Sequence, residues 1–114
     1  LDTRSLKYLY MNGNPLCNFG VITLTNDVVK NRSLEFINLA ETKMKKESAR
    51  ALSALFQENH RISSIILKNN FIEQEGISMI CIGLRQNRSL KTLDLSSTSC
   101  EDMAAAPLMK MFKQ

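Results

Sequence analysis

The chain has 114 residues, 44% of them hydrophobic and 23% charged, the composition of one folded domain of ordinary size. These proportions exclude a disordered polypeptide, and the uncharged apolar stretch from Gly76 to Leu84 is too short to cross a membrane. Fifteen basic against eleven acidic residues give a net charge of +4, which falls short of the charge pattern of a nucleic-acid-binding protein.

Strand-like and helix-like segments alternate along the chain. The first unit predicts a strand near residues 7–11, where Leu6, Leu9 and Met11 follow an apolar-x-x-apolar-x-apolar order. A helix near 20–30 follows, because Leu24 and Val28 recur at helical spacing. The same order predicts later strands near 35–39, 63–67 and 91–95 and later helices near 48–58, 76–86 and 104–112. Pro107 would lie in the first turn of the last helix, where a missing N–H costs little.

This alternation is an internal repeat of 28 residues. The first apolar position of each unit is occupied by Leu6, Leu34, Ile62 and Leu90. Eight positions after it come Asn14, Thr42, Asn70 and Thr98, and three of the units close with Asn31, Asn59 and Asn87. Agreement at so many positions indicates a repeat architecture in which each unit stacks on the next.

The repeat resembles the leucine-rich repeat L-x-x-L-x-L-x-x-N-x-L, and its length with a helix resembles the ribonuclease-inhibitor-like subclass. The resemblance implies an α/β solenoid, a horseshoe segment with a parallel sheet on the concave face and helices on the convex face. We expect a single domain over 1–114, with repeats at 6–33, 34–61, 62–89 and a partial repeat at 90–114. Because no polar cap is visible at either end, we also expect this chain to be a fragment of a longer array, continued by further repeats or a cap.

The Asn and Thr side chains eight positions into each unit are candidate structural residues. The amides of Asn14 and Asn70 are expected to satisfy backbone groups in the tight turn after each strand, and the hydroxyls of Thr42 and Thr98 to do so only in part.

Outward-facing positions of the predicted strands are candidate partner-binding residues, because nothing in the core fixes their identity. Tyr8, Tyr10 and Phe36 would be neighbours on adjacent strands. Such an aromatic cluster is typical of a binding hot spot, but it could equally stabilise the sheet or lie under an upstream repeat. The full candidate set on the concave face is Tyr8, Tyr10, Phe36, Asn38, Ile66, Lys68 and Asp94.

Other candidate sites have simpler explanations. A basic ridge of Arg32, His60 and Arg88 would lie beside the helix C-termini, where cations complement the helix dipole. His60 is the single histidine, so no catalytic constellation can be assembled and we expect a protein that is not an enzyme and needs no cofactor or metal. Three cysteines cannot all pair and have no metal-ligand spacing, which favours an intracellular, cytoplasmic protein.

The predicted function is a protein–protein interaction or scaffold module that binds a protein partner through its concave sheet. Two alternatives stay open. The family also resembles the GTPase-activating protein of the nuclear-transport GTPase Ran, which would make the chain part of an enzyme regulator. A purely structural spacer in a large ciliary or cytoskeletal assembly would instead be held by its convex helices.

Overall fold

Strands and helices alternate in a computed structural model that describes residues 5–98. The elements are, in chain order, β1 (Tyr8–Tyr10), α1 (Cys17–Val28), β2 (Phe36–Asn38), the 3-10 helix η1 (Lys46–Ser48), α2 (Ala49–Glu58), β3 (Ser64–Ile66), α3 (Glu73–Leu84) and β4 (Thr92–Asp94). The helix predicted near 104–112, with Pro107, lies outside the described residues.

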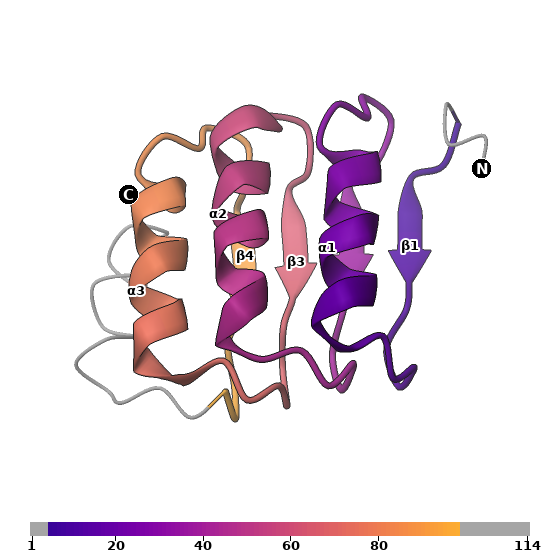
Figure 1. The fold of residues 1–114 in the computed structure, drawn as a ribbon. Helices are drawn as coiled ribbons and strands as arrows, with labels where there is room; N and C mark the ends of the chain where they lie inside the picture. The colour runs from indigo at the N-terminus through magenta and orange to yellow at the C-terminus, as the bar shows by residue number, and fades with distance from the viewer. Residues whose placement is uncertain (1–4, 99–114) are drawn as a thin grey trace.

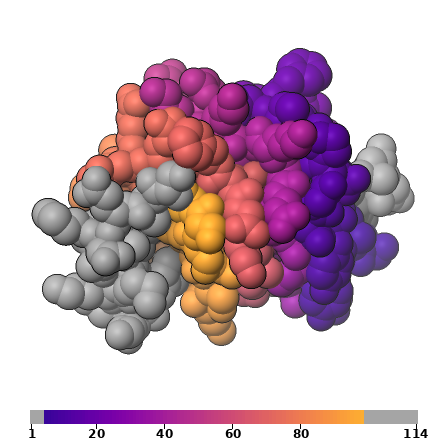
Figure 2. Space-filling model, turned by 90° about the horizontal axis from the view of Figure 1, so that it is seen from below, coloured from indigo at the N-terminus to yellow at the C-terminus, as the bar shows by residue number. Residues whose placement is uncertain are grey.

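The four strands form one parallel sheet in the order β1-β2-β3-β4. Leu9 pairs with Ile37, Ile37 with Ile65 and Ile65 with Leu93, so each strand is offset from the next by one 28-residue repeat. The helices α1, α2 and α3 lie side by side on one face of this sheet (Figure 1). Viewed from below, the repeats follow one another as bands across the molecule (Figure 2). The predicted α/β class and parallel sheet are therefore confirmed.

The core lies between the sheet and the helices. Ile37 and Ile65 from the strands and Leu52, Phe56 and Ile80 from the helices are at most 2% exposed. Each such side chain contributes roughly 1.5–3 kcal/mol to folding when it leaves water. The first repeat is less complete, because Leu6, Leu9, Met11 and Leu24 are only partly buried against this core.

The predicted element boundaries differ from the observed ones by up to three residues, and the predicted end of the second helix at residue 58 is confirmed. Each strand has three residues instead of five, although backbone hydrogen bonds such as Met11 N to the Asn38 carbonyl continue just past the strand ends. Two helices begin three residues early, since Cys17 and Glu73 adopt left-handed backbone angles (φ 57° and 66°) that turn the chain directly into a helix. In the second repeat Lys45 is extended instead, and η1 precedes α2.

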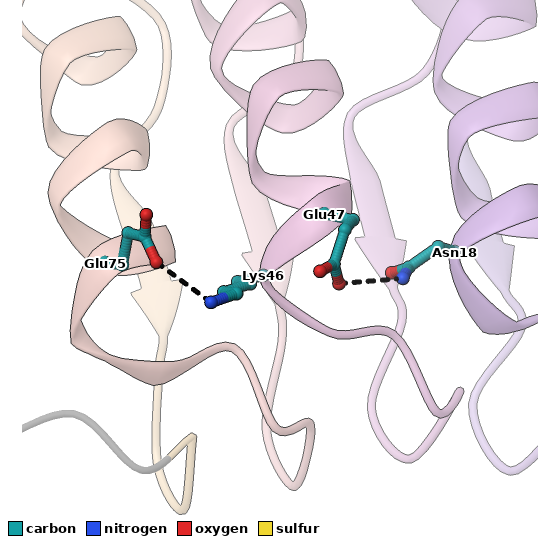
Figure 3. A network of polar contacts seen from close by, with 4 residues as sticks. All are labelled: Asn18, Lys46, Glu47 and Glu75. Carbon is teal, nitrogen blue, oxygen red and sulfur yellow. Dashed lines mark hydrogen bonds and ion pairs between the residues drawn. The ribbon is translucent and has the colours of Figure 1, made fainter.

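Polar contacts join the beginnings of the helices. Asn18 of α1 donates from Nδ2 to Glu47 Oε1 (3.1 Å), and its Oδ1 accepts hydrogen bonds from the Lys45 N–H and the Ser48 hydroxyl. Lys46 forms an ion pair with Glu75 of α3 at 3.0 Å (Figure 3). The hydrogen bond and the charge of Glu75 raise the pKa of Lys46 above its usual value. These contacts hold neighbouring repeats together on the helix side.

Candidate functional site

An aromatic cluster occupies the sheet face at its β1 end. The inward side chains of Leu9 and Ile37 alternate with the outward rings of Tyr8, Tyr10 and Phe36. The Phe36 ring centroid lies 5.1 Å from that of Tyr10 and 6.4 Å from that of Tyr8, with interplanar angles of 42° and 56°. These tilted contacts are within the range that aromatic pairs prefer. Phe36 thus forms the half-buried base of the cluster, while Tyr8 and Tyr10 are 57% and 63% exposed.

The other candidate residues of the sheet face lie on β2, β3 and β4. Ile66 is half-buried between Asn38 and Asp94, with which it is in register. Asn38 Oδ1 accepts the Ala40 N–H at 3.0 Å, and Asp94 Oδ1 accepts the N–H of Ser96 at 2.9 Å. Each side chain therefore stabilises the turn after its own strand, a local role that the sequence analysis missed.

Asp94 provides a fixed negative charge on this face. The Ser96 hydroxyl donates to its carboxylate at 2.6 Å, and this hydrogen bond, together with the Ser96 N–H, holds the pKa of Asp94 below its usual value. The positive charge of the exposed Lys68 acts in the same direction. The sheet face therefore presents aromatic rings at one end and charged groups of both signs at the other.

The structural Asn and Thr positions stand at the carboxyl ends of the strands. Asn70 is 3% exposed and donates from Nδ2 to the carbonyls of Leu39 (2.8 Å) and Leu67 (3.0 Å). Its Oδ1 accepts the N–H groups of Thr42 and Met44. Asn14 is exposed and donates to the Met11 carbonyl alone among the described groups. The hydroxyls of Thr42 and Thr98 each donate to the carbonyl three residues earlier, of Leu39 and Leu95.

A second set of asparagines joins the other ends of the repeats. Asn59 Nδ2 donates to the carbonyls of Val28 and Asn31, and its Oδ1 accepts the N–H of Ile62 at 3.0 Å. Asn87 Nδ2 likewise donates to the Phe56 carbonyl at 2.8 Å. Asn31 and Asn87, although each begins an Asn-Arg-Ser sequence, are also engaged in the framework, since their Oδ1 atoms accept the N–H groups of Leu34 and Leu90.

Metal-ligating side chains and thiols are scattered among the described residues. Residues 5–98 contain no cluster of His, Cys, Asp and Glu that could hold a metal ion. Cys17 and Cys81 are both free thiols, and burial raises the pKa of Cys81. Within the same part of the chain, no helix is long and apolar enough to cross a bilayer.

Three exposed apolar side chains escaped the sequence analysis. Phe19 on α1 is 83% exposed, Phe71 before α3 is 57% exposed and Ile82 on α3 is 52% exposed. Phe19 and Ile82 interrupt helical faces that otherwise fit the repeat, and the signal that could have found them is an apolar residue outside the repeated positions. They provide a reference set of exposed apolar residues away from the sheet.

Comparison with known proteins agrees with this architecture. The family model described as Leucine Rich repeat matches residues 86–99. Human NACHT, LRR and PYD domains-containing protein 13 is 28% identical over 88% of this chain, and chicken Leucine-rich repeat-containing protein 45 is 30% identical over 83%. The alignments span 10% and 14% of the lengths of these relatives.

Solved structures share the fold. One titled Leiomodin-1 Actin-Binding Site 2 superposes with a TM-score of 0.75 at 24% identity, over 90% of this chain and 62% of that one. A tropomodulin C-terminal domain of Caenorhabditis elegans gives 0.65 at 14% identity, over 98% and 85%. The chain is a leucine-rich repeat protein.

Proposed function

We propose that this chain is a protein-interaction module whose partner binds the exposed sheet face, the concave face of a ribonuclease-inhibitor-like array. The observation that carries the proposal is the cluster of Tyr8, Tyr10 and Phe36. Two of its rings are more than half exposed, on a surface where the repeat needs no aromatic side chain. Tyrosine is enriched at binding hot spots because it brings a large rigid surface and a hydroxyl that can donate or accept.

The rest of the sheet face suits a protein surface better than a small ligand. Lys68 and Asp94 add charges of opposite sign beyond the aromatic end, and such a mixture of apolar, polar and charged groups is typical of a protein interface. Four strands about 4.8 Å apart give a face roughly 14 Å wide, which is smaller than a standard protein interface. We therefore propose that the array continues beyond this chain and that neighbouring repeats share the partner.

The proposal includes the cellular setting and the absence of enzymatic activity. Cys17 is exposed and free, which suits a reducing intracellular compartment. His60 is engaged through both ring nitrogens, with the Gln57 carbonyl at 3.1 Å and the Arg88 N–H at 3.3 Å, so it is a structural residue and a poor candidate for a general base.

Paired surface variants test the proposal. One variant, Tyr8→Ser with Tyr10→Ser, removes the exposed rings of the sheet face. Its control, Phe19→Ser with Phe71→Ser, removes two exposed rings from other surfaces. Proteins retained from cell extract by the immobilised chain are quantified by mass spectrometry, and purified actin serves as a defined probe because one similar structure is titled an actin-binding site.

The two variants should give opposite results. A specific partner should be lost about tenfold or more from the sheet-face variant, since a hot-spot truncation costs at least about 2 kcal/mol, and be kept by the control. Loss from the control alone would contradict the proposal.

A spacer function is the second candidate, and the exposure of Phe19 and Ile82 on the helices favours it. Its partners would cover the convex side, so the Phe19→Ser and Phe71→Ser variant would lose them while the tyrosine variant would not. The same experiment therefore separates the two functions.

A further inference from the structure

The net positive charge of the described residues is concentrated at one edge of the molecule. This is the edge where the helices end and the strands begin, at the top of Figure 1. It carries seven basic residues, here called the cationic edge: Lys7, Lys30, Arg32, Arg61, Arg85, Arg88 and Lys91. It carries three acidic residues, Asp27, Glu35 and Glu58, whereas the rest of residues 5–98 has five basic and five acidic residues. The whole excess of four charges therefore lies here.

Helix dipoles do not account for most of this charge, because only Arg85, the C-cap residue of α3, stands directly at a helix end. None of the three helices has a basic residue in its last turn, where the dipole effect is felt. Arg32, Arg61 and Arg88 lie three or four residues beyond the helix ends, in the loops. The final carbonyls that a cation would complement are instead occupied by neutral amides, because Asn59 Nδ2 bonds to Val28 and Val29 and Asn87 Nδ2 bonds to Phe56.

The cations of this edge are also free of acidic partners. All seven are exposed, and the only ion pair among residues 5–98 is Lys46 with Glu75, at the opposite edge. Holding several like charges together opposes folding, and the three acidic residues of this edge offset fewer than half of its seven cations.

Two hollows lie between these side chains. A hollow of about 780 Å³ is lined by Lys30, Arg32, Arg61 and Glu58, with Asn59 at its floor. A second, of about 660 Å³, is lined by Arg85 and Arg88, and His60 borders both. Asn59 and His60 already make hydrogen bonds within the protein. The charged side chains around the hollows are therefore the groups that can attract a ligand.

We propose that the cationic edge binds an extended, acidic segment of a partner protein. Successive strands are about 4.8 Å apart, so each repeat brings its arginine within about two residues of an extended chain, which advances roughly 3.3 Å per residue. Carboxylates spaced along such a chain can each meet one guanidinium. The inference goes beyond the proposed function, because it concerns a surface separate from the sheet face.

A nucleic acid fits the same edge less well. Base stacking requires aromatic side chains, and the exposed rings of the described residues, Tyr8, Tyr10, Phe19 and Phe71, lie on other surfaces.

Fluorescence anisotropy with a labelled peptide of about twelve glutamates, long enough to cross four repeats, tests the proposal. The edge variant is Arg32→Gln, Arg61→Gln and Arg88→Gln in the full chain, whose guanidinium groups make no hydrogen bond among residues 5–98. The matched control, Lys43→Gln, Lys45→Gln and Arg50→Gln, removes the same net charge from the opposite edge. Thermal unfolding checks that both variants remain folded.

We expect the edge variant to weaken peptide binding about tenfold and the control less than about twofold, with binding that weakens as salt rises. Equal losses in both variants would overturn the proposal, since attraction would then follow net charge alone. No binding of the peptide to the unchanged chain at low salt would also overturn it. So would tighter binding of a single-stranded oligouridine of equal length that is lost with the edge variant, because the edge would then be a nucleic-acid site.

Discussion

Asn70 and Asn14 occupy the same position of the repeat, 56 residues apart, yet their side chains differ in burial and in the hydrogen bonds that they make. Asn70 lies between two repeats, is 3% exposed and bonds to backbone groups of its own turn and of the preceding one. Asn14 is exposed and bonds within its own turn. An Asn at this recurring position of the motif therefore joins repeats only where a preceding repeat supplies its partners.

Removal of the buried Asn70 side-chain amide should cause the largest loss of stability. Asn70→Ala leaves the Leu39 carbonyl and the N–H groups of Thr42 and Met44 buried without this partner, so we expect a loss of about 3 kcal/mol in the free energy of unfolding. Urea unfolding measures this loss, and the slope of the unfolding free energy against urea concentration should stay unchanged. Asn14→Ala is the control and should cost less than about 1 kcal/mol. Equal losses of stability in the two variants would contradict the different roles of Asn70 and Asn14.

The next largest loss of stability is expected where α3 packs closely against α2. A Cβ added at Gly83 of α3 would collide with the Ser53 carbonyl oxygen and lie 2.8 Å from Ser53 Cα, backbone that cannot move aside cheaply. We expect Gly83→Ala to cost about 2 kcal/mol in thermal unfolding, within the usual range for an overpacked core. The neighbouring Ile82→Ala, on the exposed side of the same helix, should cost less than about 1 kcal/mol. A tolerated Gly83→Ala would mean that α2 and α3 separate easily.

A gain of stability is expected at the second repeat. The Thr42 hydroxyl donates to the Leu39 carbonyl of its own turn and lies 3.3 Å from Asn70 Oδ1, whereas an asparagine there could also reach the Met11 carbonyl, as Asn70 reaches Leu39 one repeat later. Thr42→Asn should therefore raise the free energy of unfolding by about 0.5–1 kcal/mol. Lost stability would show that the turn at Lys43, where φ is 62°, does not accept the amide.

The smallest effect concerns pH. The folded state lowers the pKa of Asp94 below its ordinary value, so its contribution to stability is present at neutral pH and is lost as pH falls through the lowered pKa. The carboxylate is partly exposed to solvent, which screens its interactions, so we expect less than about 0.5 kcal/mol. The difference in unfolding free energy between the unchanged chain and Asp94→Asn should shrink between about pH 5 and pH 2. A difference that grows with acid would contradict this sign.

The repeat made much of the fold predictable, because a 28-residue spacing fixes both the strand register and the buried columns. Ile37, Ile65 and Leu93 align as the spacing required. The early starts of α1 and α3 were not predictable, because they depend on left-handed backbone angles at Cys17 and Glu73, which these residue types rarely adopt.

The sequence predicted which residues of the candidate site share a face of the sheet, but not the hydrogen bonds that these residues make. Alternation along the strands placed Tyr8, Tyr10 and Phe36 on one face. The turn-stabilising bonds of Asn38 and Asp94 depend on backbone geometry two residues later. The cationic edge was visible as a ridge, but its freedom from ion pairs depends on where the acidic side chains lie in space.

Crosslinking mass spectrometry on the chain bound to a partner in cell extract tests the sheet-face interaction most directly. Lys7 and Lys68 lie at opposite ends of the strands, whereas Lys46 lies at the start of the helices and pairs with Glu75. Partner crosslinks gathered on Lys7 and Lys68 are the result that the proposed function predicts. Crosslinks on Lys46, with none on Lys7 or Lys68, would contradict it and favour a spacer held by its helices.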